Sequence, residues 1–321
     1  MTAASGAARA AVGARAEAAG RLFIEGIAFW APRLPGWNAA RAILRGESPP
    51  PDRPAPRPAP AILAPTERRR APDSVAVALE AASSACAAAG RPPGELPSVF
   101  ASTFGDTGVS DYLCAQLASA PLDTSPTKFH NSVHNAAAGY WAIAAGCVQP
   151  YTALSAHQHT FGVGLATACL QALADDTATL YVAYDIETPG PLARMAPSRG
   201  LLGAGLVLAP HASARAQLAL TWRIEEGEAR ATEARVANAS LVEGNAMAGC
   251  LALFEAFADM LPAPGDAAQG ARADGLQRAS APQQASALQA PPSAPEARPA
   301  APAREVVLAL GRRIALRIEV A

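Results

Sequence analysis

The longest uncharged stretch of the chain runs from residue 129 to residue 174 and contains no Asp, Glu, Lys or Arg. Charged residues make up 17% of the sequence, so the absence of charge over this length is informative. Burial excludes ionised side chains more strongly than any others, and the pattern therefore predicts the interior of a globular core. One membrane span is excluded, because Asn, Gln, Pro and His residues divide the stretch into apolar pieces shorter than about 18 residues.

The order of apolar and polar positions within this stretch predicts a helix, a strand and a second helix. The first helix covers 132–145 and ends at Gly146, a residue type that commonly terminates helices. A short buried strand is expected at 151–155 and the second helix at 160–174. The three residues at 157–159 then form the corner between them.

The second helix carries small residues on one side and begins at a chemically informative corner. Gly164, Ala168 and Ala172 recur four residues apart, which allows another backbone to approach closely. Acyl-transfer enzymes place a nucleophile where a strand turns sharply into a buried helix. The free N–H groups and the dipole of the helix stabilise a thiolate or an oxyanion there.

Strands and helices alternate along the rest of the chain, and the strands are apolar. This pattern predicts a layered α/β fold. Further strands are expected at 21–30, 97–103, 179–185, 199–208 and 216–225, with a hairpin at 305–320, and further helices at 37–44, 74–89, 111–119 and 241–261.

Composition divides the chain into one domain with appendages. Residues 1–20 are Ala-rich and predict a frayed or disordered N-terminus, and the main domain covers 21–261 with a Pro-rich extended loop at 48–65. Residues 262–303 contain Pro, Ala, Gln and Ser without aromatic residues, which predicts a disordered insertion. The hairpin at 304–321 is expected to complete the sheet.

Charge and cysteine usage narrow the function classes. The net charge of −1 and the pI near 6.5 argue against nucleic acid or an anionic membrane as a main partner. The basic run at 66–70 is more typical of a solvated helix start than of a binding patch. Five scattered cysteines without a CxxC pair indicate reduced thiols in the cytoplasm and no metal site; they are Cys86, Cys114, Cys147, Cys169 and Cys250.

One motif carries a resemblance to a known family. Residues 139–173, GYWAIAAGCVQPYTALSAHQHTFGVGLATACLQAL, are similar to the segment of β-ketoacyl synthases, in the thiolase-like superfamily, that runs through the active-site cysteine. Counting without gaps from Pro150 places Gln158 where the family has that cysteine.

The resemblance covers residues 21 to about 210. It implies half of a thiolase-like fold, a layered α/β architecture with a mixed five-stranded sheet that lacks the C-terminal ketosynthase half. The two histidine motifs of the family are missing, because His211 is the only histidine after Pro210.

The missing groups bear directly on catalysis. Decarboxylative condensation needs a cysteine to carry the acyl chain, N–H groups to hold the oxyanion and two imidazoles to stabilise the enolate. The Gln158 carboxamide forms hydrogen bonds but no acyl-enzyme. The motif at 129–141, FHNSVHNAAAGYW, is similar to chain-length-factor-like proteins of aryl polyene or fatty-acid-like clusters.

The resemblance therefore implies a non-condensing, chain-length-factor-like subunit without a cofactor. Its partners would be a β-ketoacyl synthase subunit and an acyl carrier protein in fatty acid, polyketide or aryl polyene synthesis. Two alternatives stay open. One is a malonyl decarboxylase or acyltransferase that uses His157 or His159, and the other is a homodimer that binds an acyl group.

The individual site residues also have structural interpretations. His157 and His159 are expected to form hydrogen bonds with the backbone at the corner rather than to bind a metal. Gln158 is expected to plug the former nucleophile pocket. His130 and His134, one helical turn apart, are expected at a subunit seam rather than on a metal. The predicted interface or pocket residues are His130, His134, Phe161, Gly164 and Ala168.

Overall fold

The computed structural model describes residues 18–227, 230–262 and 302–321. The predictions for residues 1–20 and 262–303 fall almost wholly outside the described residues. Among the described residues, no helix is long and apolar enough to cross a membrane.

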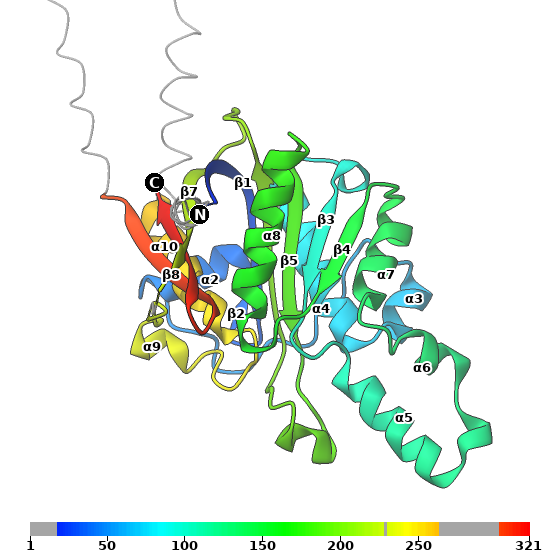
Figure 1. Cartoon of the computed structure of the whole chain (residues 1–321). Coiled ribbons are helices and arrows are strands. Elements are labelled where there is room, and N and C mark those ends of the chain that lie inside the picture. The colour runs from blue at the N-terminus through cyan, green and yellow to red at the C-terminus, as the bar shows by residue number, and fades with distance from the viewer. Residues whose placement is uncertain (1–17, 228–229, 263–301) are drawn as a thin grey trace, which may run out of the picture.

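A single mixed sheet organises the described residues (Figure 1). Its order is β4-β3-β5-β6-β1-β7-β9-β8, and the short β2 pairs with β1. The neighbours of β3 run parallel to it, whereas every other pairing is antiparallel. The strands are β1 (Ala19–Ala31), β2 (Leu34–Pro35), β3 (Ser98–Ala101), β4 (Tyr151–Leu154), β5 (Thr179–Asp185), β6 (Leu202–Ala209), β7 (Leu218–Glu226), β8 (Arg304–Gly311) and β9 (Ile314–Val320).

The mixed α/β architecture is confirmed, but the expected count of five strands is too low. Nine strands join the sheet within the described part of the chain. The extra length arises because β7 pairs along the first half of β1, and the terminal hairpin then adds to β7 through β9.

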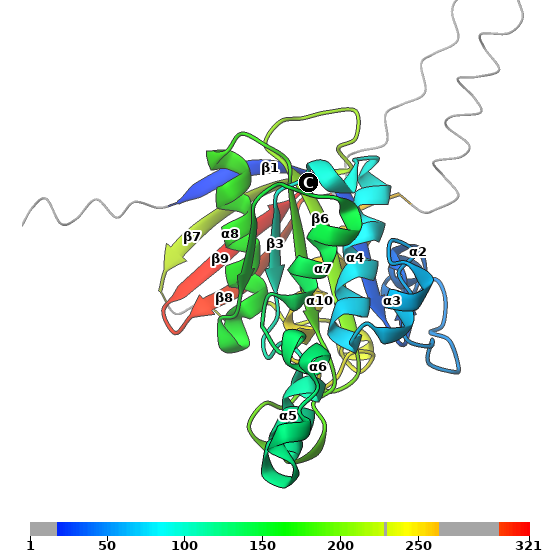
Figure 2. The same cartoon turned by 90° about the vertical axis from the view of Figure 1, so that its right-hand side faces the viewer.

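Helices cover both faces of the sheet (Figures 1 and 2). One apolar cluster joins α4 and α7 to one face, and a second joins α2, α8 and α10 to the other. The helices are α2 (Trp37–Leu44), α3 (Pro65–Arg70), α4 (Asp73–Ala89), α5 (Thr107–Ser119), α6 (Pro126–His130), α7 (Ala136–Ala145), α8 (Thr160–Ala174), α9 (Val236–Ala239) and α10 (Leu251–Met260).

Two predicted helices are shorter than expected. The one at 132–145 begins only at Ala136, because the chain turns between α6 and α7: Ser132 donates to the Phe129 carbonyl through both its backbone N–H and its hydroxyl. The one at 241–261 is regular only over α10.

The terminal hairpin packs against the first turns of α8. Gly162 packs against β8 so closely that a Cβ there would lie 3.0 Å from Leu310 Cδ2 and 3.1 Å from the Ala309 carbonyl. Apolar residues of β8 and β9, such as Leu308 and Ile318, belong to the same cluster as α8 and α10. The chain therefore covers its own core on this side.

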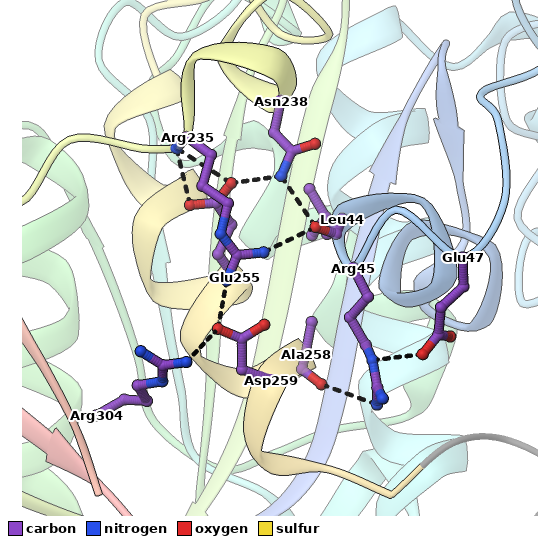
Figure 3. A network of polar contacts seen from close by, with 9 residues as sticks. All are labelled: Leu44, Arg45, Glu47, Arg235, Asn238, Glu255, Ala258, Asp259 and Arg304. Atoms are coloured by element: carbon purple, nitrogen blue, oxygen red, sulfur yellow. Dashed lines mark hydrogen bonds and ion pairs between the residues drawn. The ribbon is translucent and has the colours of Figure 1, made fainter. Parts of the chain in front are cut away.

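A polar network fastens α10 to its neighbours (Figure 3). The buried Glu255 carboxylate accepts hydrogen bonds from the Arg235 backbone N–H at 3.0 Å and from Asn238 Nδ2 at 2.5 Å. Asp259 forms ion pairs with Arg235 and, at 3.3 Å, with Arg304 at the start of β8. The network thus links α9, α10 and the hairpin.

Candidate functional site

The corner at 157–159 connects β4 to α8 and carries an unusual backbone conformation. His157 has φ of +52°, a value that residues with a Cβ rarely adopt. Thr160 holds the turn, because its hydroxyl donates to the His157 carbonyl at 2.6 Å and accepts from the Ala156 N–H at 2.9 Å. Side chains on such strained strand-to-helix turns are presented outward, as nucleophiles are in other folds. The strained position belongs to His157, one residue before Gln158.

Gln158 does not plug a pocket, so that expectation is wrong. Its side chain is exposed, and its Nε2 atom lies 3.3 Å from Nε2 of the neighbouring His159. The described part of the chain contains no group of three His, Cys, Asp or Glu residues placed to hold a metal ion. The corner therefore exposes His157 and Gln158 to solvent, with the half-buried His159 beside them.

No thiol lies at this corner. All five cysteines are free, and Cys169, on the same helix, is wholly buried. Burial raises the pKa of the Cys169 and Cys250 thiols far above the ordinary range and that of Cys86 to about 12. Thiolates at these positions are suppressed, and none of them serves as a nucleophile.

A buried carboxylate organises the edge of the sheet beside the corner. Asp185 ends β5, where it accepts hydrogen bonds from Ser102 Oγ at 2.8 Å, the Thr103 N–H at 3.0 Å and the Phe104 N–H at 3.3 Å. Burial raises the pKa of Asp185, although these hydrogen bonds act in the opposite direction. We name Asp185 with residues 102–105 the Asp185 hub. Sequence reasoning missed it, although an Asp that ends an apolar strand is a visible signal.

The hub also anchors His134. The Nε2 atom of His134 lies 2.9 Å from the Ser102 carbonyl oxygen, and its ring packs over Gly105, which has φ of +65°. His130 is exposed and lines a separate cavity of about 380 Å³ together with Tyr151 of β4. The two histidines therefore face different surroundings rather than one shared ligand.

The remaining predicted interface or pocket residues, Phe161, Gly164 and Ala168, lie inside the chain. A Cβ on Gly164 would lie 2.8 Å from both Ala101 Cβ and Tyr181 Oη, so the small-residue side of α8 packs on this chain's own sheet. Ala168 is fully buried, and the Phe161 ring packs on Tyr181 with centroids 5.7 Å apart. The close approach predicted from the small residues is real, but the sheet provides the other surface.

Much of the uncharged stretch lies on the surface, contrary to the prediction that it is interior. Ile143 is 80% exposed and Val148 is 93% exposed, and Tyr151 beside them is also exposed. We name these three residues the β4 face. Among the described strands β4 pairs only with β3, so its outer edge is open, and it carries no charged residue. Proteins normally protect an open edge with charge, which makes this edge suited to pairing.

A second cavity lies on the other side of the α6–α7 turn. It has a volume of about 800 Å³ and runs between the end of α3, the start of α5 and helix α6. Arg70 and Lys128 contribute positive charge to its wall, and three carboxylates contribute negative charge: Asp73, Asp106 and Glu187. Arg69 and Arg70 form no ion pair with any described residue, so the end of α3 is a basic surface.

Comparison with known proteins identifies the same family as the sequence motif. The model of the β-ketoacyl synthase N-terminal domain matches residues 37–258. No curated protein matches the chain in sequence.

Solved structures share the fold at low sequence identity. A chain of the complex between the ketosynthase ApeO and its chain length factor ApeC from Xenorhabdus doucetiae is 16% identical, with a TM-score of 0.60; the match covers 93% of this chain and 98% of that chain. A β-ketoacyl synthase from Burkholderia phymatum is 14% identical, with a TM-score of 0.51 over 72% of this chain and 70% of that one. The ishigamide ketosynthase/chain length factor is 18% identical, also with a TM-score of 0.51, over 65% and 68%.

Proposed function

The chain belongs to the β-ketoacyl synthase N-terminal domain family, and from this premise we propose that it is a non-condensing, chain-length-factor-like subunit. It acts with a β-ketoacyl synthase subunit and an acyl carrier protein in fatty acid, polyketide or aryl polyene-type chain synthesis in the cytoplasm. The observation that supports this proposal most strongly is the strand-to-helix corner, which presents His157 and Gln158 and no thiol. Residues 21–261 and 304–321 form its single domain.

The chemistry of the corner supports a non-condensing role. An acyl-enzyme needs a nucleophile that the corner lacks, although the α8 N-terminus retains free N–H groups that could hold an oxyanion. Incubation with malonyl-loaded carrier protein separates this proposal from the decarboxylase alternative. We expect no acetyl product from the isolated chain, and product that disappears in His157→Ala would establish the alternative instead.

The proposed contact with the ketosynthase subunit is the β4 face. It combines an open, uncharged sheet edge with exposed apolar side chains, a combination found at interfaces rather than on free surfaces. The alternative surface is the outer side of α8. The hairpin covers its first turns, whereas Leu170 and Leu173 are exposed near its end without an open strand edge beside them. A partner that pairs with β4 would extend the sheet and bury Ile143 and Val148.

We expect Ile143→Lys to weaken the complex with the β-ketoacyl synthase subunit at least tenfold, or about 1.4 kcal/mol. The reason is that the substitution places an ammonium group in an apolar contact. Titration calorimetry of the purified subunits measures the dissociation constant. Val236→Lys is the matched control, because Val236 is 91% exposed on α9, away from β4 (Figure 1).

The outcomes of this experiment separate the open alternatives. A wild-type chain that never binds the ketosynthase contradicts the proposal. Native mass spectrometry that shows a stable homodimer, disrupted by the same Ile143→Lys substitution, supports the homodimeric acyl-binding protein instead.

We propose that the carrier protein docks through an acidic face on the basic end of α3, beside the cavity of about 800 Å³. Arg69 and Arg70 are exposed and form no ion pair with a residue that the structure describes, so both are available to a partner. We expect the double substitution Arg69→Glu with Arg70→Glu to weaken carrier binding about tenfold and to flatten its dependence on salt. Fluorescence anisotropy of labelled carrier protein at several ionic strengths measures both effects.

The matched control reverses the same charge elsewhere. Arg312 and Arg313 are exposed in the hairpin turn, distant from α3 in Figure 1. Arg312→Glu with Arg313→Glu changes the net charge equally, and we expect it to leave binding within about twofold. Equal losses of carrier affinity in both double variants would show that binding depends on the net charge of the chain and not on α3. That result would contradict docking at α3.

A further inference from the structure

Helices α5 and α6 form an arm that projects from the body of the molecule (Figures 1 and 2). We define the arm as residues 107–130. It carries large apolar side chains in the open: Leu122 is 98% exposed, Phe129 66% and Leu117 60%. Three such side chains on one projection are costly in water and indicate a contact surface.

The arm is held at both ends by polar contacts to one region. At its start, Asp106 caps α5 by accepting from the Val109 N–H at 2.7 Å, and it also accepts from Ser74 Oγ at 2.6 Å. Thr107 Oγ1 donates to the Glu187 carbonyl at 3.2 Å. After its end, the His134 ring contacts the Ser102 carbonyl.

The two stems of the arm converge on the Asp185 hub. Residues 102–105 lead directly into the arm, and their backbone is held by the buried Asp185 carboxylate. The Ser102 hydroxyl that donates to Asp185 also accepts from the Gly105 N–H at 2.9 Å. A change at Asp185 therefore acts on the segment that leaves the sheet and, through the Ser102 carbonyl, on the segment that returns.

The area needed for a stable complex connects the arm with the β4 face. A standard interface buries about 800 Å² on each partner, whereas three apolar side chains offer roughly half of that. The arm and the β4 face lie on the same side of the molecule, joined by the α6–α7 turn (Figure 1). A subunit that covers the β4 face is thus placed to reach the arm.

We propose that the arm forms the second part of the contact with the β-ketoacyl synthase subunit, and that Asp185 is the positioning residue that sets its angle. This inference rests on the proposed function. The arm provides apolar contact area through Leu122 and Phe129, and the hub holds that area in register with the β4 face.

The native thiol on the arm provides the first test. Cys114 is exposed on α5, whereas the other four cysteines are buried, so a maleimide–benzophenone reagent labels the arm selectively. In the complex with the ketosynthase we expect photo-cross-links from Cys114 to the partner. We also expect Leu122→Asp to weaken binding about tenfold, with Val236→Asp, at a similarly exposed apolar residue on α9, as the control.

A double-substitution cycle tests the positioning role of Asp185. We expect Asp185→Asn to weaken the complex about fivefold in the wild-type background but less than twofold in the Leu122→Asp background, because a misplaced arm matters only while the arm makes contact. If Asp185→Asn does not fold, His134→Leu replaces it, with His134→Gln as the variant that restores a donor to the Ser102 carbonyl.

The results separate this inference from the proposed function. A complex that forms and is lost in Ile143→Lys, but gives no Cys114 cross-link and ignores Leu122→Asp, overturns the role of the arm and leaves the proposed function standing. Equal losses from Asp185→Asn in both backgrounds would reduce Asp185 to a purely structural residue. Absence of any complex refutes both proposals.

Discussion

Phe254→Ala is expected to lower the free energy of unfolding by about 4 kcal/mol, because it removes an aromatic ring from the centre of the larger apolar cluster. Phe254 of α10 is fully buried. Its ring centroid lies 4.8 Å from that of Phe29, 5.5 Å from that of Phe257 and 5.7 Å from that of Trp37. The contacts join α10 to β1 and α2, so a cavity here loosens three elements at once.

Urea denaturation followed by tryptophan fluorescence measures the effect. Val236→Ala is the control, because the side chain is exposed on the neighbouring α9 and its truncation should change the free energy of unfolding by less than about 0.5 kcal/mol. A loss below about 1 kcal/mol for Phe254→Ala would contradict the packing of α10 against β1.

The strands were predictable where burial is complete on both faces. The apolar run at 179–185 matches β5, every residue of which is buried, because helices cover both sides of the central sheet. The hairpin strands β8 and β9 are only partly buried, and the hairpin was predictable instead from its two apolar runs and the Gly311-Arg312 pair near the turn. Its pairing with β7 was not, because a strand's partner depends on long-range contacts that a local pattern does not record.

The uncharged stretch shows where composition misleads. Absence of charge predicted an interior, yet Ile143 and Val148 are exposed. Interfaces exclude charge for the same physical reason as cores do, because both remove side chains from water. The sequence alone therefore could not distinguish a residue covered by its own chain from one that awaits a partner.

The corner at 157–159 illustrates a second limit of prediction from sequence. Its position between β4 and α8 was predictable from the change of pattern, and the absence of cysteine was plain. Which residue takes the positive φ was not, because His157, Gln158 and His159 are all polar and none is glycine. Backbone conformation at such a turn depends on contacts such as those of Thr160.

Buried charges inside the elements were also missed. Glu25 lies within the apolar strand β1, and the hydrophobic pattern alone gave no partner for it. The structure places Arg91, 66 residues away, against its carboxylate, and Ser213 Oγ donates to the same group at 2.6 Å. The register of β1 against β6 shifts at this point, so the pair fixes an irregularity in the sheet.

We expect Arg91→Ala to lower the free energy of unfolding by about 3 kcal/mol near neutral pH. Removing one member of a buried ion pair leaves an uncompensated charge and typically costs about 3–5 kcal/mol. The lower end applies because the Arg91 side chain is 29% exposed and Ser213 still binds the carboxylate. Urea unfolding measures the loss. Ser213→Ala keeps the cation and is the control, with an expected cost of about 1 kcal/mol.

The pH dependence identifies the charge as the cause. Burial alone would raise the pKa of Glu25, but the hydrogen bonds from Arg91 and Ser213 outweigh it and lower the pKa below the ordinary value of 4.5. A lowered pKa in the folded chain gives stability that is fully present above the unfolded value and is lost as the pH falls through the folded one. The difference between wild type and Arg91→Ala should therefore be constant near neutral pH and shrink below about pH 4.5. A difference that persists unchanged down to about pH 3 would show that Arg91 acts by packing rather than by charge.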